Sequence, residues 1–111
     1  MSKYNSRKTV IDGITFDSKK EAKRYVELKK RQEEGEITDL RLQVPFELVP
    51  SFVIEIDGKK RKRRNIRYIA DFTYYENGKK VVEDVKGRKT DIYKLKKKLF
   101  EYKYKITIKE T

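Results

Sequence analysis

The amino-acid sequence predicts one small α/β domain, of the α+β kind with a mixed sheet, whose core has the element order αβββαβ. Three observations predict this class. Apolar residues recur at helical spacing in two separate segments. Asn-Gly and Asp-Gly pairs stand between strand-like runs, as in β-hairpins. The last third of the chain has the order strand, helix, strand, which is typical of parallel strands joined by a crossover.

The N-terminal part predicts a short hairpin and then a helix. The hairpin covers residues 9–16 and turns at Asp12-Gly13. The helix covers residues 18–34 and ends at Gly35, because glycine readily takes the left-handed conformation found after helices. Residues at i, i+4 and i+7 spacing share its inward face. These residues are Glu21, Tyr25 and Leu28, with Ala22 beside them.

The middle of the chain predicts a strand and then a hairpin arm. The strand covers residues 43–49, and the hairpin turns at Asp57-Gly58 after a strand over residues 52–56. The returning strand begins with six consecutive cations, which cannot have a buried face. We therefore expect a basic β-hairpin arm that projects beyond the sheet. The six cations are Lys59, Lys60, Arg61, Lys62, Arg63 and Arg64.

A third hairpin, over residues 68–87, places three charged side chains together. Asn77-Gly78 is a strong two-residue turn signal. Counting outward from this turn pairs Asp71 with Asp84, so two carboxylates that repel each other stand on adjacent strands. Lys86 shares the face of Asp84 and is a diagonal neighbour of Asp71. The register therefore predicts that two acids and one lysine converge.

The surroundings of this cluster favour a metal site over a solvated ion pair. Apolar residues flank it on both faces of the hairpin, and buried acids are costly unless a cation joins them. Mg²⁺ favours one or two carboxylates together with waters and phosphate oxygens. An exposed cluster of ion pairs is the alternative. Glu83 competes as a ligand, but strand alternation places it on the opposite face, so Asp84 is the better candidate.

The C-terminal part predicts a second helix and a last strand. Thr90 or Asp91 can cap the helix. Its apolar stripe is expected to contain Ile92, Leu95 and Leu99. Residues 106–108 are short and rich in β-branched side chains, which is typical of a strand.

Composition restricts both the partner and the chemistry. The chain has 30 Lys and Arg against 18 Asp and Glu, a net charge of +12. This balance favours a polyanion, first nucleic acid and second an anionic membrane surface. The chain lacks the amphipathic helix with aromatic anchors that a membrane-surface protein would use. Because there is no Cys or His, hydrolysis would have to use carboxylates, Lys, Tyr, Ser or Thr.

Nothing in the sequence predicts a membrane span or a secretion signal. No apolar run approaches the roughly 20 residues that cross a bilayer, and residues 1–8 lack the apolar core of a signal peptide. We therefore expect a soluble, cytoplasmic protein with no membrane partner.

Asp71 followed by Asp84-Val85-Lys86 resembles the D…(D/E)-x-K signature of the PD-(D/E)xK nuclease superfamily, which includes restriction endonucleases and Holliday junction resolvases. The segments F-D-S-K-K-E-A, Y-I-A-D-F and V-E-D-V-K-G also resemble a phage family of unknown function assigned to that superfamily. Ala70 stands where the superfamily name has proline, a position at which proline is often absent. The resemblance implies a restriction-endonuclease-like core and, for a phage protein, the host cytoplasm.

This resemblance implies a metal-dependent endodeoxyribonuclease with Mg²⁺ as cofactor, which Mn²⁺ can replace, and no small-molecule cofactor. Asp71, Asp84 and the Val85 carbonyl would hold the metal, and Lys86 would orient or deprotonate the attacking water. Glu21 would reach the metal through water or a second ion. Its alternative role is that of a capping-box residue, because Ser18-x-x-Glu21 has the capping-box pattern.

DNA is the expected partner, bound through its backbone without reading of sequence. The resemblance favours branched DNA such as a four-way junction, and cutting both strands of a junction would require a homodimer. The alternative is a basic DNA-binding protein without catalysis. Beside the six cations of the arm, which could also serve solubility or nuclear localisation, the candidate DNA contacts are Arg67, Arg88, Lys89, Lys94 and Lys97.

Overall fold

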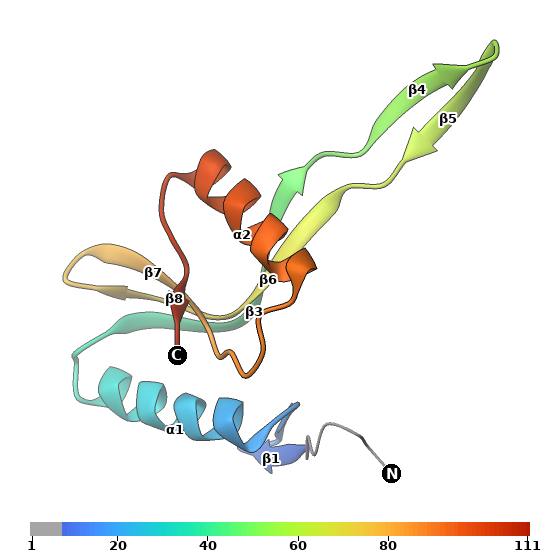
Figure 1. Ribbon diagram of the computed structural model, residues 1–111. Coiled ribbons are helices and arrows are strands. Elements are labelled where there is room, and N and C mark those ends of the chain that lie inside the picture. Colours follow the sequence, from blue (N-terminus) through green and yellow to red (C-terminus); the bar gives the residue numbers. More distant parts are fainter. Residues whose placement is uncertain (1–7) are drawn as a thin grey trace.

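The computed structural model describes residues 8–111, which form a mixed α+β fold (Figure 1). The predicted absence of a signal-peptide core concerns residues 1–7 almost entirely and lies outside the described part. No helix within residues 8–111 is long and apolar enough to cross a membrane. The helices are α1 (Lys19–Glu33) and α2 (Asp91–Tyr104). The strands are β1 (Thr9–Ile11), β2 (Ile14–Phe16), β3 (Thr38–Val49), β4 (Phe52–Ile56), β5 (Lys59–Arg63), β6 (Ile66–Glu76), β7 (Lys79–Asp84) and β8 (Lys109–Glu110).

The central sheet has four strands in the order β3-β6-β7-β8. The first two pairings are antiparallel, and β7 pairs with β8 in parallel. Helix α2 provides the crossover between these parallel strands, as the order strand, helix, strand predicts. The core order α1, β3, β6, β7, α2, β8 confirms the predicted arrangement, with the β1–β2 hairpin in front and the β4–β5 arm inserted.

Two apolar clusters hold the helices on the sheet. The cluster at α1 contains Tyr25 and Leu28, which confirms the predicted inward face of this helix. The cluster at α2 contains Tyr93 and Phe100. Strand β6 contributes to both clusters: Tyr68 and Ala70 belong to the cluster at α2, and Phe72 and Tyr74 belong to the cluster at α1. Asp71 stands between these two pairs in the strand. The acid therefore lies in the sheet between the two regions that the helices cover.

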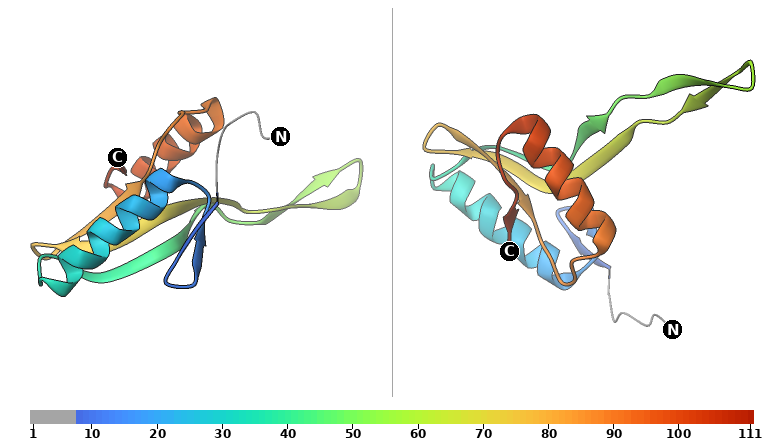
Figure 2. Two further views of the ribbon diagram at one scale, coloured as in Figure 1. Left: turned by 90° about the horizontal axis from the view of Figure 1, so that it is seen from below. Right: turned by 45° about the horizontal axis from the view of Figure 1, so that its top comes forward.

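The arm projects far from the rest of the molecule, as predicted (Figures 1 and 2). All residues of β4 and β5 are exposed. The two strands pair from Phe52 with Arg63 to Ile56 with Lys59, around the predicted Asp57-Gly58 turn. The arm contributes to a longest molecular dimension of 59 Å.

The predicted apolar stripe of the second helix is wrong. Ile92 and Leu95 are 68% and 59% exposed, and Leu99 is half-buried. The helix instead buries Tyr93 and Phe100. Aromatic rings bury more apolar area than aliphatic side chains do, so the face that carries Tyr93 and Phe100 turns toward the sheet.

The strand positions also differ from the prediction at two places. Strand β3 begins at Thr38 instead of residue 43, because its pairing with β6 extends to Tyr75. The last strand lies at Lys109–Glu110 instead of residues 106–108. Lys105 ends α2 in the left-handed conformation, and the following residues cross back to the sheet, where Ile108 fills the core before pairing with β7 begins.

Candidate active site

The predicted acidic cluster lines a cleft of about 740 Å³. Three parts of the chain form this cleft: the start of α1, the first half of β6 with the root of the arm, and the segment from the end of β7 to the start of α2. The structure thus brings together residues that are distant in the sequence. The cleft is lined by all the predicted catalytic and metal-binding residues, namely Glu21, Asp71, Asp84, Val85 and Lys86.

The two aspartates lie where the β6–β7 ladder ends. Its pairs run from Glu76 with Lys79 to Phe72 with Glu83, so Asp71 and Asp84 follow directly in the predicted register. The Val85 backbone N–H donates a hydrogen bond of 2.9 Å to Oδ2 of Asp71. This bond fixes the Asp71 carboxylate across the end of β7, and Asp84 beside it is only 4% exposed.

Burial and the repulsion of neighbouring acids raise the pKa of two carboxyls in the cleft, those of Asp71 and Glu21. Burial, followed by the contact with Asp84, raises the pKa of Asp71 to about 8. Burial, followed by the charges of Asp17 and Asp84, also raises the pKa of Glu21. These carboxyls are therefore more stable when one of them is protonated or when a cation binds between them.

Lys86 is held by contacts on several sides. Its Nζ lies 2.6 Å from Oδ2 of Asp84 and 3.8 Å from the centre of the Tyr93 ring. An ammonium over an aromatic ring is attracted by the ring quadrupole. The Lys86 carbonyl accepts a hydrogen bond of 2.9 Å from Lys20 of α1. These contacts hold the Lys86 ammonium beside the acidic pair.

Glu21 uses its backbone and its side chain for different purposes. Its backbone N–H donates to Oγ of Ser18 over 3.1 Å, which is the forward half of the predicted capping box. Its Oε1 accepts from Nε2 of Gln43 over 3.2 Å, and the same Nε2 lies 3.3 Å from Oδ1 of Asp71. Glu21 is thus tied to the acidic pair through the Gln43 amide.

Gln43 is a site residue that the sequence does not reveal. It lies in the middle of β3 with a φ of 52°, a conformation that is uncommon for a residue with a side chain. The hydrogen bonds of its amide to the two acids can offset the cost of this conformation. A glutamine in a strand has no sequence pattern that would distinguish it.

Tyr68 presents an unpaired polar atom at the same place. Its side chain lines the cleft and is 4% exposed. Within residues 8–111, its hydroxyl is the one buried side-chain polar atom without a hydrogen-bond partner. Burial, and then the charge of Asp84, raises the pKa of this hydroxyl. Since an unpaired buried hydroxyl costs free energy, a ligand in the cleft would supply a partner.

These residues fit a Mg²⁺ ion bound together with its substrate. Within residues 8–111, no group of three or more His, Cys, Asp or Glu side chains forms a protein-only metal site. Mg²⁺ needs only one or two carboxylates when waters and phosphate oxygens complete its octahedron. Asp71 and Asp84 would supply these carboxylates, and a dication would relieve the repulsion that helps to raise the pKa of Asp71.

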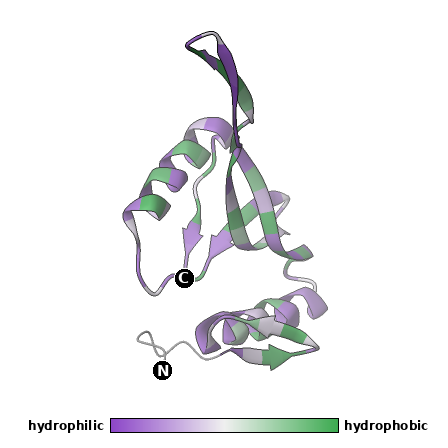
Figure 3. Ribbon diagram, turned by 90° about the vertical axis from the view of Figure 1, so that its right-hand side faces the viewer, coloured by the Kyte–Doolittle hydropathy of each residue, from purple (hydrophilic) through white to green (hydrophobic). Residues whose placement is uncertain are grey.

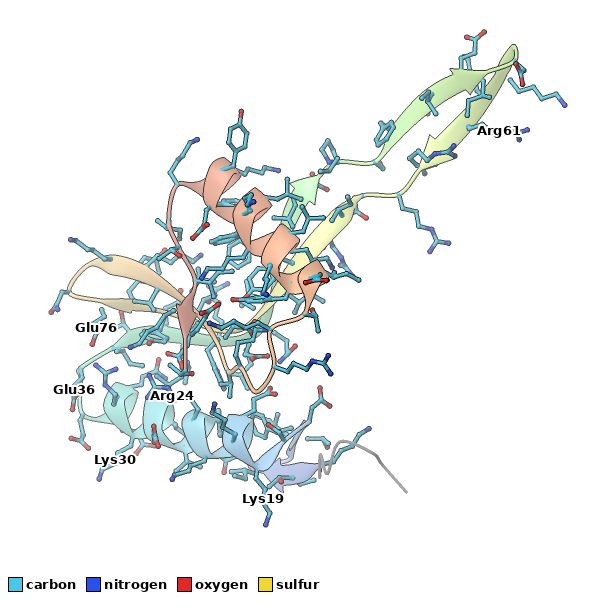
Figure 4. The ribbon with its side chains drawn as sticks, viewed as in Figure 1. Lys19, Arg24, Lys30, Glu36, Arg61 and Glu76 are labelled. Atoms are coloured by element: carbon cyan, nitrogen blue, oxygen red, sulfur yellow. The ribbon has the colours of Figure 1, made fainter. Side chains whose placement is uncertain are left out.

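Glu83 lies on the other side of β7 from the cleft, where its contacts indicate a structural role. Its side chain is fully buried and accepts 2.6 Å hydrogen bonds from Arg24 Nε and the Tyr74 hydroxyl. Figure 4 shows Arg24 on the side of α1 that faces the sheet. Burial acts to raise the pKa of Glu83, but the bonds from Arg24 and Tyr74 outweigh it and lower the pKa. Strand alternation thus separates the two adjacent acids, as the sequence predicts.

The predicted DNA-contact residues fall into three groups. The six cations of the arm are exposed, and Arg64 and Arg67 line the cleft at its root. Arg88 and Lys94 are exposed near the start of α2. Lys89 and Lys97 instead form ion pairs of 2.9 and 3.2 Å with Glu110, and the Lys97 side chain is 28% exposed. These two lysines have a structural partner on β8.

The fold and the cleft define an α+β protein with paired acids and a lysine in a cleft at the root of a basic arm. The chain belongs to the family described as Protein of unknown function (DUF1064), which matches residues 1–110. Neither a curated protein nor a solved structure matches the chain.

Proposed function

We propose that the protein is a metal-dependent endodeoxyribonuclease with a restriction-endonuclease-like core of the PD-(D/E)xK superfamily. The observation that carries the proposal is the convergence of Asp71, Asp84 and Lys86 in one cleft. The sequence order D…D-x-K predicts this convergence, and the cleft adds the unpaired hydroxyl of Tyr68. A carboxyl with a raised pKa next to a second acid in a cleft, as at Asp71, is typical of catalytic sites.

Asp71 and Asp84 would hold Mg²⁺ or Mn²⁺, with the Val85 carbonyl as the third protein ligand. When bound, the metal supplies positive charge to the phosphate and the leaving oxygen and acidifies a bound water. The hydrogen bond from the Val85 N–H keeps the Asp71 carboxylate oriented for this role. Gln43 keeps Glu21 close to Asp71, so Glu21 can hold a water at the edge of the site.

Lys86 would act on the attacking water. Its ammonium is positioned by Asp84 and by the Tyr93 ring, so it can donate a hydrogen bond to that water and orient it toward the phosphate. The Tyr68 hydroxyl would donate a hydrogen bond to a phosphate oxygen and thereby gain the partner it lacks. The reaction is hydrolysis of a DNA phosphodiester bond, with water as the nucleophile.

DNA as the substrate is supported by the charge of +12 and by the arm that begins at the cleft. Backbone contacts from lysine and arginine bind DNA of any sequence, so selection by DNA shape is the more fitting specificity. A branched substrate such as a four-way junction rests on analogy with resolvases. A homodimer would provide the two active sites that cutting both strands of a junction requires.

A DNA-binding protein without catalysis is the second candidate. One observation favours it: Lys86 Nζ lies 2.6 Å from Asp84 Oδ2. An ion pair this close is also what a purely structural role for these two residues would produce. In that case the basic surface would bind DNA and the acids would only fix the end of β7.

A cleavage panel tests the proposal. Purified protein is incubated with duplex, flap, four-way-junction and single-stranded DNA in Mg²⁺, in Mn²⁺ and in EDTA. We expect cleavage of at least the junction with either metal and none in EDTA. Binding without cleavage of any substrate in either metal would refute the nuclease and support the second candidate.

A further inference from the structure

The arm exposes large apolar side chains next to its cations. On β4, Phe52, Val53, Ile54 and Ile56 are 41–61% exposed. Strand β5 pairs with β4 and contains only lysine and arginine. Figure 3 shows the contrast between the hydrophobic β4 and the hydrophilic β5. An exposed apolar patch rimmed by charge is typical of an interaction surface.

The pairing register makes the two faces of the arm different. Side chains alternate along each strand, so Phe52, Ile54 and Ile56 share one face with their cross-strand partners. These partners are Arg63, Arg61 and Lys59, and this face has no acid. The opposite face carries Val53 opposite Lys62 and Glu55 opposite Lys60. We call the face with Phe52, Ile54 and Ile56 the apolar-cationic face.

The chemistry of this face favours DNA as the partner. The cations suit phosphates, and the apolar side chains suit thymine methyl groups and base edges. A second copy of the chain would bring two sets of arm cations together, which is unfavourable. The root of the arm adds a positional argument, because Arg64, Asn65 and Arg67 line the same cleft as Asp71 and Asp84. DNA held at the cleft would therefore continue along the arm.

The dimensions of the arm indicate which groove of DNA it fits. Paired strands lie about 4.8 Å apart, and five residues span about 17 Å. The major groove, roughly 12 Å wide, admits a two-stranded ribbon, whereas the minor groove is roughly 6 Å wide. A length of about 17 Å corresponds to about five base pairs at a spacing of ~3.4 Å.

We propose that the apolar-cationic face of the arm inserts into the major groove of a duplex segment about five base pairs long, next to the cleft. Phe52, Ile54 and Ile56 contact base edges and methyl groups, and the cations of β5 contact the flanking phosphates. An isolated two-stranded hairpin is marginally stable in water, so the groove also stabilises the arm. This inference rests on the proposed function for the orientation of DNA at the cleft.

The absence of cysteine in the chain allows a direct test by cross-linking. A single Ile54→Cys substitution is combined with Asp84→Asn, and duplex and junction DNA carry a thiol tethered to N4 of one cytosine, which lies in the major groove. We expect a disulfide cross-link at cytosines within about five base pairs of the cleft. Val53→Cys on the opposite face is the matched control and should cross-link at least tenfold less. Equal yields from both positions, or no yield from Ile54→Cys, would overturn the inference.

Two further measurements distinguish DNA from a membrane surface as the partner of this face, and distinguish the placement of the arm from the nuclease activity. The variant F52S/I54S/I56S should lose about tenfold in duplex affinity and lose the protection of guanine N7 against methylation. Unchanged DNA affinity together with lost binding to vesicles of anionic lipid would assign the face to a membrane surface and overturn the inference. Cleavage by the wild-type chain is measured separately. Absent cleavage with retained cross-linking would refute the nuclease but not the placement of the arm.

Discussion

The ionised side chain of Asp71 destabilises the folded state. Its carboxyl is partly removed from water beside a second acid, and this raises its pKa to about 8. Between pH 4 and pH 8 the folded chain therefore retains a proton that the unfolded chain has released. The contribution of Asp71 to the free energy of unfolding must therefore fall as the pH rises through this interval. A buried acidic pair with this cost is understandable if a cation binds it during function.

The substitution Asp71→Asn tests this cost. Without metal at pH 8, the variant should have a free energy of unfolding about 1 kcal/mol above that of the wild type, because the cleft is open to water and only part of the pKa shift counts. The advantage should shrink toward pH 4, because there the unfolded chain also begins to bind this proton and the two states differ less in protonation. Urea unfolding at several pH values measures the difference. A variant that is equally destabilised at both pH values would contradict the raised pKa.

Tyr68 allows the fold and the chemistry to be separated. In Tyr68→Phe the ring still packs against Tyr93 and Phe100 while the unpaired hydroxyl is removed. We expect the free energy of unfolding to stay within about 1 kcal/mol of wild type or to rise. Single-turnover cleavage should fall by roughly tenfold to a hundredfold because a donor to the phosphate is lost. Unchanged cleavage would show that the hydroxyl does not contact the substrate.

At the residue scale, the predictable part of the site is the part that strand register determines. Asp71, Asp84 and Lys86 follow from counting outward from Asn77-Gly78, and the cleft contains all of them. Gln43 and Tyr68 do not follow from any count. Their importance depends on a positive φ in β3 and on an unpaired atom, which are properties of the folded chain only.

Among the elements, the hairpins were predictable and the orientation of α2 was not. Asp57-Gly58 and Asn77-Gly78 fix their turns locally, because positive φ is needed there and few residues tolerate it. In α2, by contrast, large apolar side chains occur on both the buried and the exposed sides, among many lysines. The choice of face depends on packing against β3 and β6, which the sequence pattern does not contain.

The buried face of α2 can be tested with two substitutions of the same kind. Phe100→Ala removes a fully buried ring and should lower the free energy of unfolding by about 3–5 kcal/mol. Leu95→Ala removes a side chain that is 59% exposed and should change it by about 0.5 kcal/mol or less. Thermal or urea unfolding measures both. The opposite ranking would restore the stripe of Ile92, Leu95 and Leu99 as the inward face.

At the scale of the whole molecule, positive charge is concentrated on an arm that starts at an acidic cleft. This arrangement predicts salt-dependent DNA binding in which the arm releases counterions. Arg61→Gln should reduce the slope of log K against log salt by about 0.9, the value for one phosphate contact. Lys30→Gln, on α1, is the control and should leave the slope unchanged (Figure 4). An equal loss from both variants would mean that only net charge matters.

The central claim is that the paired acids hold a catalytic metal, and Asp84→Asn tests it most directly. Binding and cleavage of one four-way junction are measured side by side for wild type and variant, in Mg²⁺ and in EDTA. We expect the wild type to cleave only with Mg²⁺, and the variant to bind with a Kd within about threefold of wild type while its cleavage falls at least about a hundredfold. Cleavage by the variant at the wild-type rate, or wild-type cleavage that persists in EDTA, would contradict the claim.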